Sequence, residues 1–390
     1  MKDKLKVSLI VWNLSTNDGF IRASLLQTAL EKLGHDTEIL GFIFDQELYG
    51  AIPPQSKFFA VEGAKYPQFF GKIRQLLQRI NGDIIYAIKP QPASFGVALI
   101  KKIYTRKPII LDIDDWEMSW HGGDEWHYRP NIKQLARDLL KSEGALKNPQ
   151  HPVYIKWMEN LVKKADAVTV HTQFLQQRFG GVSVPNGKDT NLFDPAKFNP
   201  EISRKRYGLE GYRILMFPGA PRPYKGLEDV LMALEKINQP DLKLVIVGGS
   251  PYDDYDEQLQ QKWGNWIIKL PKFPADVMPD IVAAAHIIVV PQRDTPATRA
   301  QFPLKLTDGM AMAKPVLSTR VGDIPEILGD TGYLAEPSSP EQLAEQIQLI
   351  FEDLDTANLR GAKARQRCVE KYSLEAMSQA LKSVIAGLSV

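Results

Sequence analysis

Short apolar runs alternate with helix-like stretches along almost the whole chain, and this alternation constrains the fold most strongly. In the first half, the apolar runs are Val7–Trp12, Thr37–Phe44, Ile84–Ile88, Ile109–Ile113 and Ala167–His171. Between them lie stretches of helical period such as Ile21–Leu33 and Phe69–Ile80. Alternating strands and helices predict a parallel, doubly wound sheet whose ligands bind at the loops that follow the strands.

A second alternating series follows, with apolar runs at Ile214–Phe217, Leu244–Val247, Trp266–Leu270, Ile287–Val290 and Val316–Thr319. At 390 residues, the chain exceeds the usual size of one domain. We therefore expect an α/β protein of two Rossmann-like domains, residues 1–190 and 191–372, facing each other across a cleft. A C-terminal helical segment, residues 373–390, could pack back on the first domain.

Composition excludes several classes of protein. A net charge of +2 is too small to imply nucleic-acid binding, and no stretch approaches the roughly 20 apolar residues of a membrane-spanning helix. The single cysteine, Cys368, excludes an intramolecular disulfide, which fits a reducing compartment. We expect a cytoplasmic location, with the inner face of the membrane as the alternative.

Residues 299–319 contain a pattern that predicts a helix and an anion-binding position at its start. Pro303 suits the start of a helix and Pro315 cannot continue one, so the segment is typical of a short helix that enters a strand. The free N–H groups at the start of this helix follow the strand ending near Pro291, and such a position can hold an anion such as a diphosphate.

A basic loop follows the first strand of the second half. Gly219, Arg222 and Lys225 lie between that strand and an apolar helix face that begins at Leu227. A guanidinium and an ammonium together could neutralise a leaving diphosphate. The alternative is a pair of solvated surface cations.

Pro185–Asp189 has the composition of a turn and is the expected hinge between the domains. This segment, the basic loop and residues 299–319 follow one another in an order that resembles a known family. The chain resembles the retaining, nucleotide-sugar-dependent glycosyltransferases of the GT-B fold, specifically the large family four, over nearly all of its second half. Pro185, Asn186, Gly187 and Asp189 match that family's Pro-Asn-Gly-x-Asp segment.

The resemblance implies roles for individual residues. Arg222 and Lys225 fall on the phosphate-binding cations, and Asp308 replaces the glutamate that binds the ribose hydroxyls. The remaining positions expected to contact the donor are Gly219, Gln301, Phe302, Pro303 and Leu304. The resemblance also implies that the sugar is transferred with retention, without a metal and with no cofactor besides the sugar donor.

One position departs from the family pattern. Ala300 stands where the family has its first acidic residue. Three explanations remain open: the role passes to Gln301, Asp294 or the backbone, the donor sugar is unusual, or activity is lost.

The first domain offers further candidates. Gly19 could let the backbone approach the donor phosphates and Arg22 could assist, although an ordinary capped helix is the simpler interpretation. Asp112, Asp114 and Asp115 end a buried strand. They could bind a divalent metal, as in GT-A glycosyltransferases, or orient the acceptor, and we assign Asp114 to catalysis.

His171 at a strand end is an auxiliary candidate. Residues 117–164, where tryptophans mix with an excess of basic side chains, form either a solvated helical excursion or a surface for the acceptor or for lipid headgroups. The expected acceptor is a glycan, a lipid-linked molecule or a small molecule. The rival functions are a catalytically silent nucleotide-sugar binder and a nucleotide-sugar epimerase of the same fold.

Overall fold

The computed structural model describes residues 4–45, 57–250 and 253–388. The chain divides into two compact units: residues 1–186 together with 377–390, and residues 187–376. The first divide falls between Asn186 and Gly187 rather than at the expected residue 190. The C-terminal residues 377–390 group with the first unit.

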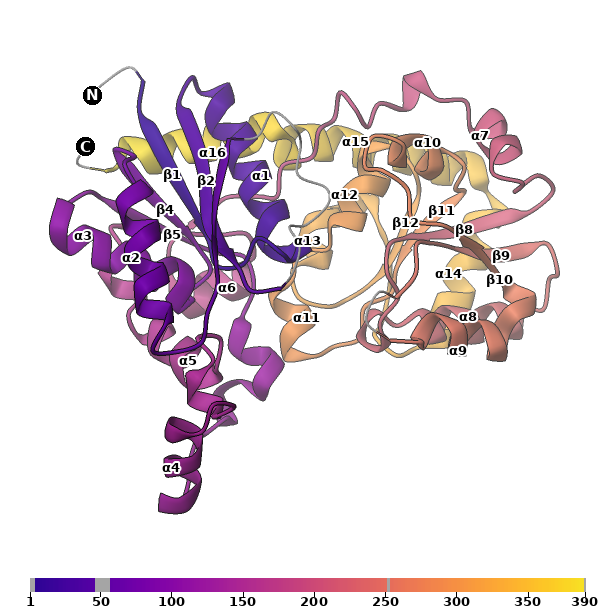
Figure 1. Ribbon diagram of the computed structural model, residues 1–390. Coiled ribbons are helices and arrows are strands. Elements are labelled where there is room, and N and C mark those ends of the chain that lie inside the picture. Colours follow the sequence, from indigo (N-terminus) through magenta and orange to yellow (C-terminus); the bar gives the residue numbers. More distant parts are fainter. Residues whose placement is uncertain (1–3, 46–56, 251–252, 389–390) are drawn as a thin grey trace. The chain divides into compact units, whose positions relative to one another are not determined.

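In the described part of the first unit, a seven-stranded parallel sheet has the order β3-β2-β1-β4-β5-β6-β7 (Figure 1). Its strands are β1 (Lys6–Val11), β2 (Asp36–Ile43), β3 (Phe58–Glu62), β4 (Ile84–Ile88), β5 (Ile109–Ile113), β6 (Ala167–Val170) and β7 (Val182–Ser183). Its helices are α1 (Asn17–Lys32), α2 (Phe69–Arg79), α3 (Val97–Thr105), α4 (Ile132–Leu140), α5 (Pro152–Asn160) and α6 (Gln173–Phe179).

In the described part of the second unit, a six-stranded parallel sheet has the order β10-β9-β8-β11-β12-β13. Its strands are β8 (Arg213–Pro218), β9 (Leu242–Val247), β10 (Ile267–Leu270), β11 (Ile287–Val290), β12 (Val316–Thr319) and β13 (Tyr333–Ala335). Its helices are α7 (Pro200–Arg206), α8 (Leu227–Ile237), α9 (Tyr255–Trp263), α10 (Met278–Ala283), α11 (Pro296–Ala300), α12 (Leu304–Ala311), α13 (Ile324–Leu328), α14 (Pro340–Glu352) and α15 (Leu354–Tyr372).

The central strands are buried on both faces, as strands covered by helices on both sides require. Every residue of β4, β5 and β11 is buried, and their sequences are continuous apolar runs apart from Asp112. In each sheet the order reverses beside the first strand, between β1 and β4 and between β8 and β11. Ligands of doubly wound sheets bind at such reversal points, beyond the carboxyl ends of the strands.

The last helix, α16 (Leu374–Ala386), begins in the second unit and ends in the first. Met377, Leu381 and Ile385 lie on one helix face and join the apolar core around β1 and α1. The C-terminal helix is therefore part of the apolar core of the first unit.

Candidate functional site

The loops after β8 and β11 meet at the reversal point of the second sheet. Gly226, in the loop after β8, has φ +71°, and a Cβ there would lie 1.9 Å from the carbonyl oxygen of Pro291. Glycine is therefore required at this position by both the backbone conformation and the close approach. The two loops form one packed surface at the end of the sheet.

Three polar side chains converge on this surface. The side-chain oxygen of Gln301 accepts a hydrogen bond from Lys225 Nζ at 3.1 Å and another from Gln292 Nε2 at 3.2 Å. Lys225 and Gln301 were both predicted as site residues, and the structure brings them into contact. Gln292 was not predicted, although its place directly after the buried strand β11 could have identified it.

Gly219, the first residue after β8, lies under the side chain of Lys305. A Cβ on Gly219 would be 2.6 Å from Lys305 Cε and 2.9 Å from its Nζ. Burial lowers the pKa of Lys305, and the nearby Asp308 partly offsets this effect. Lys305, the second residue of α12, is thus a further cation beside the loop after β8, and the sequence analysis did not single it out.

Arg222 lies on the same loop as Lys225, and it is already paired. Its guanidinium donates to Asp253 Oδ2 at 3.0 Å, and the Asp253 carboxylate also accepts from the Ser250 hydroxyl. Ser250 and Asp253 follow β9, so this ion pair links the loops after two neighbouring strands. The Asp253 side chain is exposed, which leaves the pair open to solvent.

Helix α12 begins at Leu304, with Pro303 as its N-cap, one residue later than the sequence predicted. The side chain of Phe302 is buried in the core, where its ring lies 5.6 Å from that of Tyr372. Contact between Phe302 and the donor stays a prediction. The first N–H groups of α12, from Leu304 onward, have no acceptor within the helix, as at any helix start.

Asp308, one turn into α12, forms an ion pair with Lys188, and both side chains are largely buried. Lys188 also lies over the ring of Phe193, with Nζ 4.2 Å from the ring centroid. The contact joins residues 120 positions apart, and no local pattern indicated it. A ribose at Asp308 would therefore share the carboxylate with Lys188.

Ala300 is fully buried at the end of α11, a short helix that the sequence did not predict. Asp294, one candidate to replace the missing acid, is held in a two-pronged ion pair by Arg299, at 2.6 Å and 2.7 Å. Of the two side chains proposed to take over the role, only Gln301 contacts the predicted phosphate-binding lysine.

In the first unit, Arg22 is part of the core rather than of a ligand surface. Its Nε and one terminal nitrogen donate to the two oxygens of Asp112 at 2.8 Å and 2.9 Å. Its remaining N–H groups donate to the carbonyls of Val184 and Pro185 and to the side chain of Asn186. All five guanidinium donors are satisfied, which corrects the prediction that Arg22 binds the donor phosphates.

The same contacts contradict the prediction that Asp112 binds a metal or orients the acceptor. Its side chain is fully buried, and Thr169 Oγ1 donates to it at 2.6 Å in addition to Arg22. The carboxylate is therefore unavailable to an acceptor or to a metal. His171 lies at the edge of this network, where its Nδ1 is 3.2 Å from Asn186 Nδ2, and its auxiliary role stays a prediction.

Asp114 and Asp115 lie in a cluster built around Lys89, which follows β4. Lys89 Nζ is 2.7 Å from Glu117 Oε1 and 3.9 Å from Asp114 Oδ1. Burial raises the pKa of Asp114 to about 7, against the opposing effect of Lys89. Asp115 accepts from Trp120 Nε1 at 2.9 Å, and burial raises its pKa to about 6.

Gly19 lies in the first turn of α1 and faces the preceding loop. A Cβ there would be 2.8 Å from the carbonyl oxygen of Asn13 and 3.0 Å from Val11 Cγ1. Packing of the helix against its own loop thus accounts for the glycine, and contact with a donor phosphate stays a prediction.

Two features are absent from the residues that the structure describes. No group of three or more His, Cys, Asp or Glu side chains there is arranged to hold a metal ion. Across the same residues, no helix combines the length and the apolar character needed to span a membrane.

Known proteins resemble this chain in sequence and in fold. Residues 212–353 match the family model described as glycosyl transferases group 1. The N-acetyl-alpha-D-glucosaminyl L-malate synthase of Bacillus anthracis is 25% identical over 78% of this chain and 74% of its own. A GDP-mannose-dependent phosphatidylinositol monomannoside mannosyltransferase of Mycolicibacterium smegmatis is 23% identical over 60% of this chain and 66% of its own.

The matches to other named relatives span about half of those proteins' lengths. Among solved structures, Anabaena HepE in complex with UDP-glucose superposes with a TM-score of 0.75 over 98% of this chain and all of its own, at 17% identity. The fold, the matched segment and these relatives lead to one conclusion: residues 212–353 match the group 1 glycosyltransferases, a family of transferase enzymes, and the chain has the GT-B fold.

Proposed function

We propose that this protein transfers a sugar from a nucleoside diphosphate sugar to an acceptor hydroxyl, with retention of configuration and without a metal. The observation that carries the proposal is the convergence of Lys225, Gln301 and Gln292 at the reversal point of the second sheet. A cationic side chain held beside the loops that follow β8 and β11 suits the diphosphate of a donor.

The diphosphate would be bound by Lys225, Arg222 and the N–H groups at the start of α12. The positive end of that helix dipole favours an anion, and a guanidinium can bind two phosphate oxygens at once. Because exposed ion pairs contribute little, Arg222 can exchange Asp253 for phosphate at small cost. Lys305 beside Gly219 would add a fourth source of positive charge.

Two further contacts would fix the donor. Asp308 would accept hydrogen bonds from the ribose hydroxyls while it remains paired with Lys188. Gln301 would take the place of the missing acid, because its amide can donate to a sugar hydroxyl while its oxygen accepts from Lys225. A neutral amide supplies orientation without the charge of a carboxylate.

In the reaction, the acceptor oxygen forms a bond to the anomeric carbon as the bond to the diphosphate oxygen breaks. The departing diphosphate takes the acceptor's proton, so the step needs no strong protein base. Arg222, Lys225 and the α12 N–H groups stabilise the charge that develops on the leaving group. Asp114, whose pKa is raised to about 7 by burial, is the proposed catalytic residue of the first unit.

The acceptor class follows only from the relatives. The names of two of them give L-malate and a phosphatidylinositol monomannoside as acceptors, a small hydroxy acid and a lipid-linked glycan. We propose an acceptor within this range, with transfer in the cytoplasm.

A panel of UDP-, GDP-, ADP-, CDP- and dTDP-sugars tests the donor half of the proposal by thermal shift. We expect the nucleotide sugars of one particular nucleobase to raise the unfolding temperature of the protein. A ligand that binds only the folded state stabilises that state. Slow release of the free nucleoside diphosphate then separates an enzyme from a silent binder. Conversion of the sugar without any acceptor would instead indicate an epimerase.

Replacement of Lys225 by alanine should lower turnover by on the order of 10²-fold, as for other preorganised charge stabilisers. Lys262→Ala, which removes an exposed lysine on α9, is the matched control and should leave turnover unchanged. A normal rate in Lys225→Ala would remove the basis of the proposal. Loss of activity in EDTA and its recovery with manganese would overturn the metal-free mechanism.

A further inference from the structure

Helix α4 of the first unit exposes an apolar face. Ile132, Leu135, Ala136, Leu139 and Leu140 recur at the three- and four-residue spacing that places side chains on one side of a helix. Ile132 is 90% exposed and Leu140 is 78% exposed. A contiguous apolar face left open to water marks a surface that binds something.

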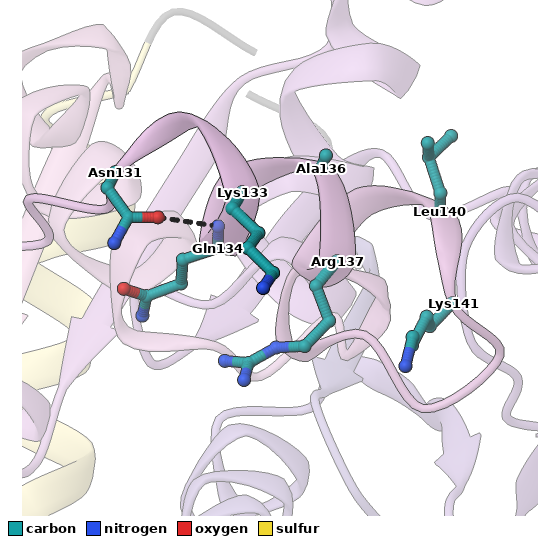
Figure 2. A pocket seen from close by; sticks show the side chains of 7 residues that line it. All are labelled: Asn131, Lys133, Gln134, Ala136, Arg137, Leu140 and Lys141. Carbon is teal, nitrogen blue, oxygen red and sulfur yellow. Dashed lines mark hydrogen bonds between the residues drawn. The ribbon is translucent and has the colours of Figure 1, made fainter.

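The neighbouring face of α4 is basic. Lys133, Arg137 and Lys141 follow at four-residue spacing, and Figure 2 shows their side chains on one side of the helix with Leu140 on the other. Together with Asn131, Gln134 and the apolar Ala136 and Leu140, they line a shallow depression along the helix. From Arg129 to Lys141 there are four basic residues and one acidic residue, Asp138.

A third face attaches α4 to the rest of the first unit. Asp138 is buried and accepts a hydrogen bond from the Tyr128 hydroxyl at 2.8 Å. The glycine at 144 lets the chain pass close to the carbonyl of Asp138, because a Cβ there would lie 2.2 Å from that oxygen. Asn131 caps the first turn through Gln134 N at 2.8 Å. Figure 1 shows the helix standing out beyond α5.

We propose that α4 docks the protein onto the surface of an anionic lipid bilayer. Apolar side chains beside a row of cations match the boundary between acyl chains and phosphate headgroups. The charge selects this occupant over a second copy of the chain, because a symmetric contact would bring the same three cations against one another. This inference is independent of the proposed glycosyl transfer.

Two exposed tryptophans belong to the same excursion of the chain as α4. Trp120 and Trp157 lie in the same excursion of the chain, residues 117–164, and both are about half exposed. Tryptophan prefers the interface between lipid and water, where one part of the ring is apolar and the other can donate a hydrogen bond.

Co-sedimentation of the full-length protein with vesicles tests the proposal. Vesicles of phosphatidylcholine alone are compared with vesicles that also contain phosphatidylglycerol, at low and high salt. We expect binding to the anionic vesicles that weakens as salt is added, because salt screens the contacts of the cations. Reversal of charge in the triple variant Lys133→Glu, Arg137→Glu and Lys141→Glu should lower the partition coefficient by on the order of 100-fold.

The apolar face is tested by the triple variant Ile132→Ser, Leu139→Ser and Leu140→Ser, which should also bind weakly although every cation remains. The matched controls lie in the second unit: Lys262→Glu with Lys363→Glu and Lys371→Glu, and Leu359→Ser, whose side chain is 67% exposed. These controls should bind like the unaltered protein. Circular dichroism verifies that each variant folds, and the single changes Leu140→Ser and Lys133→Glu replace any triple variant that does not.

Three results would overturn the proposal. Equal binding to neutral and anionic vesicles would remove the role of the cations. Loss of binding in the control variants would show a general charge effect rather than a docking helix. A dimer in light scattering that dissociates on Leu139→Ser would assign the apolar face to contact between copies.

Discussion

Arg22 illustrates how much of a residue's role is set by partners far away in the sequence. Its place one turn into the first helix allowed both a phosphate ligand and a residue of an ordinary capped helix. Its partner Asp112 is 90 positions away, and the carbonyls that complete its contacts lie beyond residue 180. Only the fold reveals that these groups meet and that the guanidinium is fully occupied.

Arg22→Ala should therefore lower the free energy of unfolding by about 3–5 kcal/mol, because it leaves the Asp112 carboxylate buried and unpaired. Urea denaturation measures this difference. Arg74→Ala, at an exposed position of α2, serves as the control and should change stability by less than about 0.5 kcal/mol. An unchanged stability together with weaker binding of the nucleotide sugar would restore the phosphate role of Arg22.

Asp114 predicts a dependence of stability on pH. Its folded-state pKa of about 7 lies above the ordinary value of 3.8, so its contribution is fully present below the ordinary pKa and is lost as pH rises through 7. Asp114→Asn should therefore be more stable than the unaltered protein at pH 8, by about 2–4 kcal/mol, and equally stable near pH 4.

The comparison is made by urea denaturation at both pH values. Asp124→Asn is the control of opposite sign, because the Arg178 guanidinium lowers the pKa of Asp124 and the substitution removes that ion pair. This variant should gain no stability at pH 8. A stability difference for Asp114→Asn that does not vary with pH would contradict the raised pKa.

At the scale of elements, the buried strands were predicted well and the edge strand β10 was predicted to within one residue, whereas three other edge strands were missed. The predicted bounds of β4, β5, β11 and β12 match the structure because these strands are continuous apolar runs. The strands β3, β7 and β13 were missed, since each lies at or near a sheet edge and is short or only partly apolar. Pairing with a neighbouring strand defines them, and a single sequence does not contain that information.

The candidate site likewise contains some features that the sequence predicts and others that only the fold reveals. The loop after β8 and the start of α12 could be predicted, because both follow recognisable apolar runs. The roles of Lys188 and Lys305 could not, since Lys188 is 120 positions from its partner and the contact of Lys305 with Gly219 exists only in the fold. The contact between Gln301 and Lys225 also required the fold, because two adjacent loops of the sheet supply it.

Helix α12 lies so close to the sheet that one of its positions has room only for glycine. A Cβ on Gly309 would lie 2.9 Å from Ile288 Cβ and 2.9 Å from Val316 Cγ2. Gly309→Ala should therefore cost about 1–3 kcal/mol of stability, because the added methyl group pushes the helix away from β11 and β12. The same displacement moves the start of α12, so the affinity for the nucleotide sugar should fall as well.

Gly71→Ala on α2 is the matched control, since nothing lies within 4 Å of the Cβ position there. Without that obstacle, alanine should stabilise the helix by about 0.5–1 kcal/mol relative to glycine. Thermal unfolding should therefore show a lower unfolding temperature for Gly309→Ala and a higher one for Gly71→Ala. A gain of stability in Gly309→Ala would show that α12 can move without consequence for the fold.

At the scale of the whole molecule, the chain leaves its first unit at residue 186 and returns to it at residue 377. Helical period in residues 374–385 predicted the final helix, and packing on the first domain was given as one option, but an apolar face alone does not specify its partner residues. The structure assigns Met377, Leu381 and Ile385 to the core formed by β1 and α1. The stability of the first unit thus depends on the last residues of the chain.

Two core substitutions test this organisation. Leu381→Ala and Leu231→Ala each remove a fully buried side chain, the first from the core of the first unit and the second from that of the second unit. Each should cost about 2–5 kcal/mol, equivalent to a fall of roughly 5–15 °C in the unfolding temperature of its own unit. In calorimetry of the full-length protein we expect two transitions, of which each variant lowers a different one. Because Leu381 is separated in sequence from the rest of its unit by residues 187–376, a shift of the same transition in both variants would contradict the division into two units.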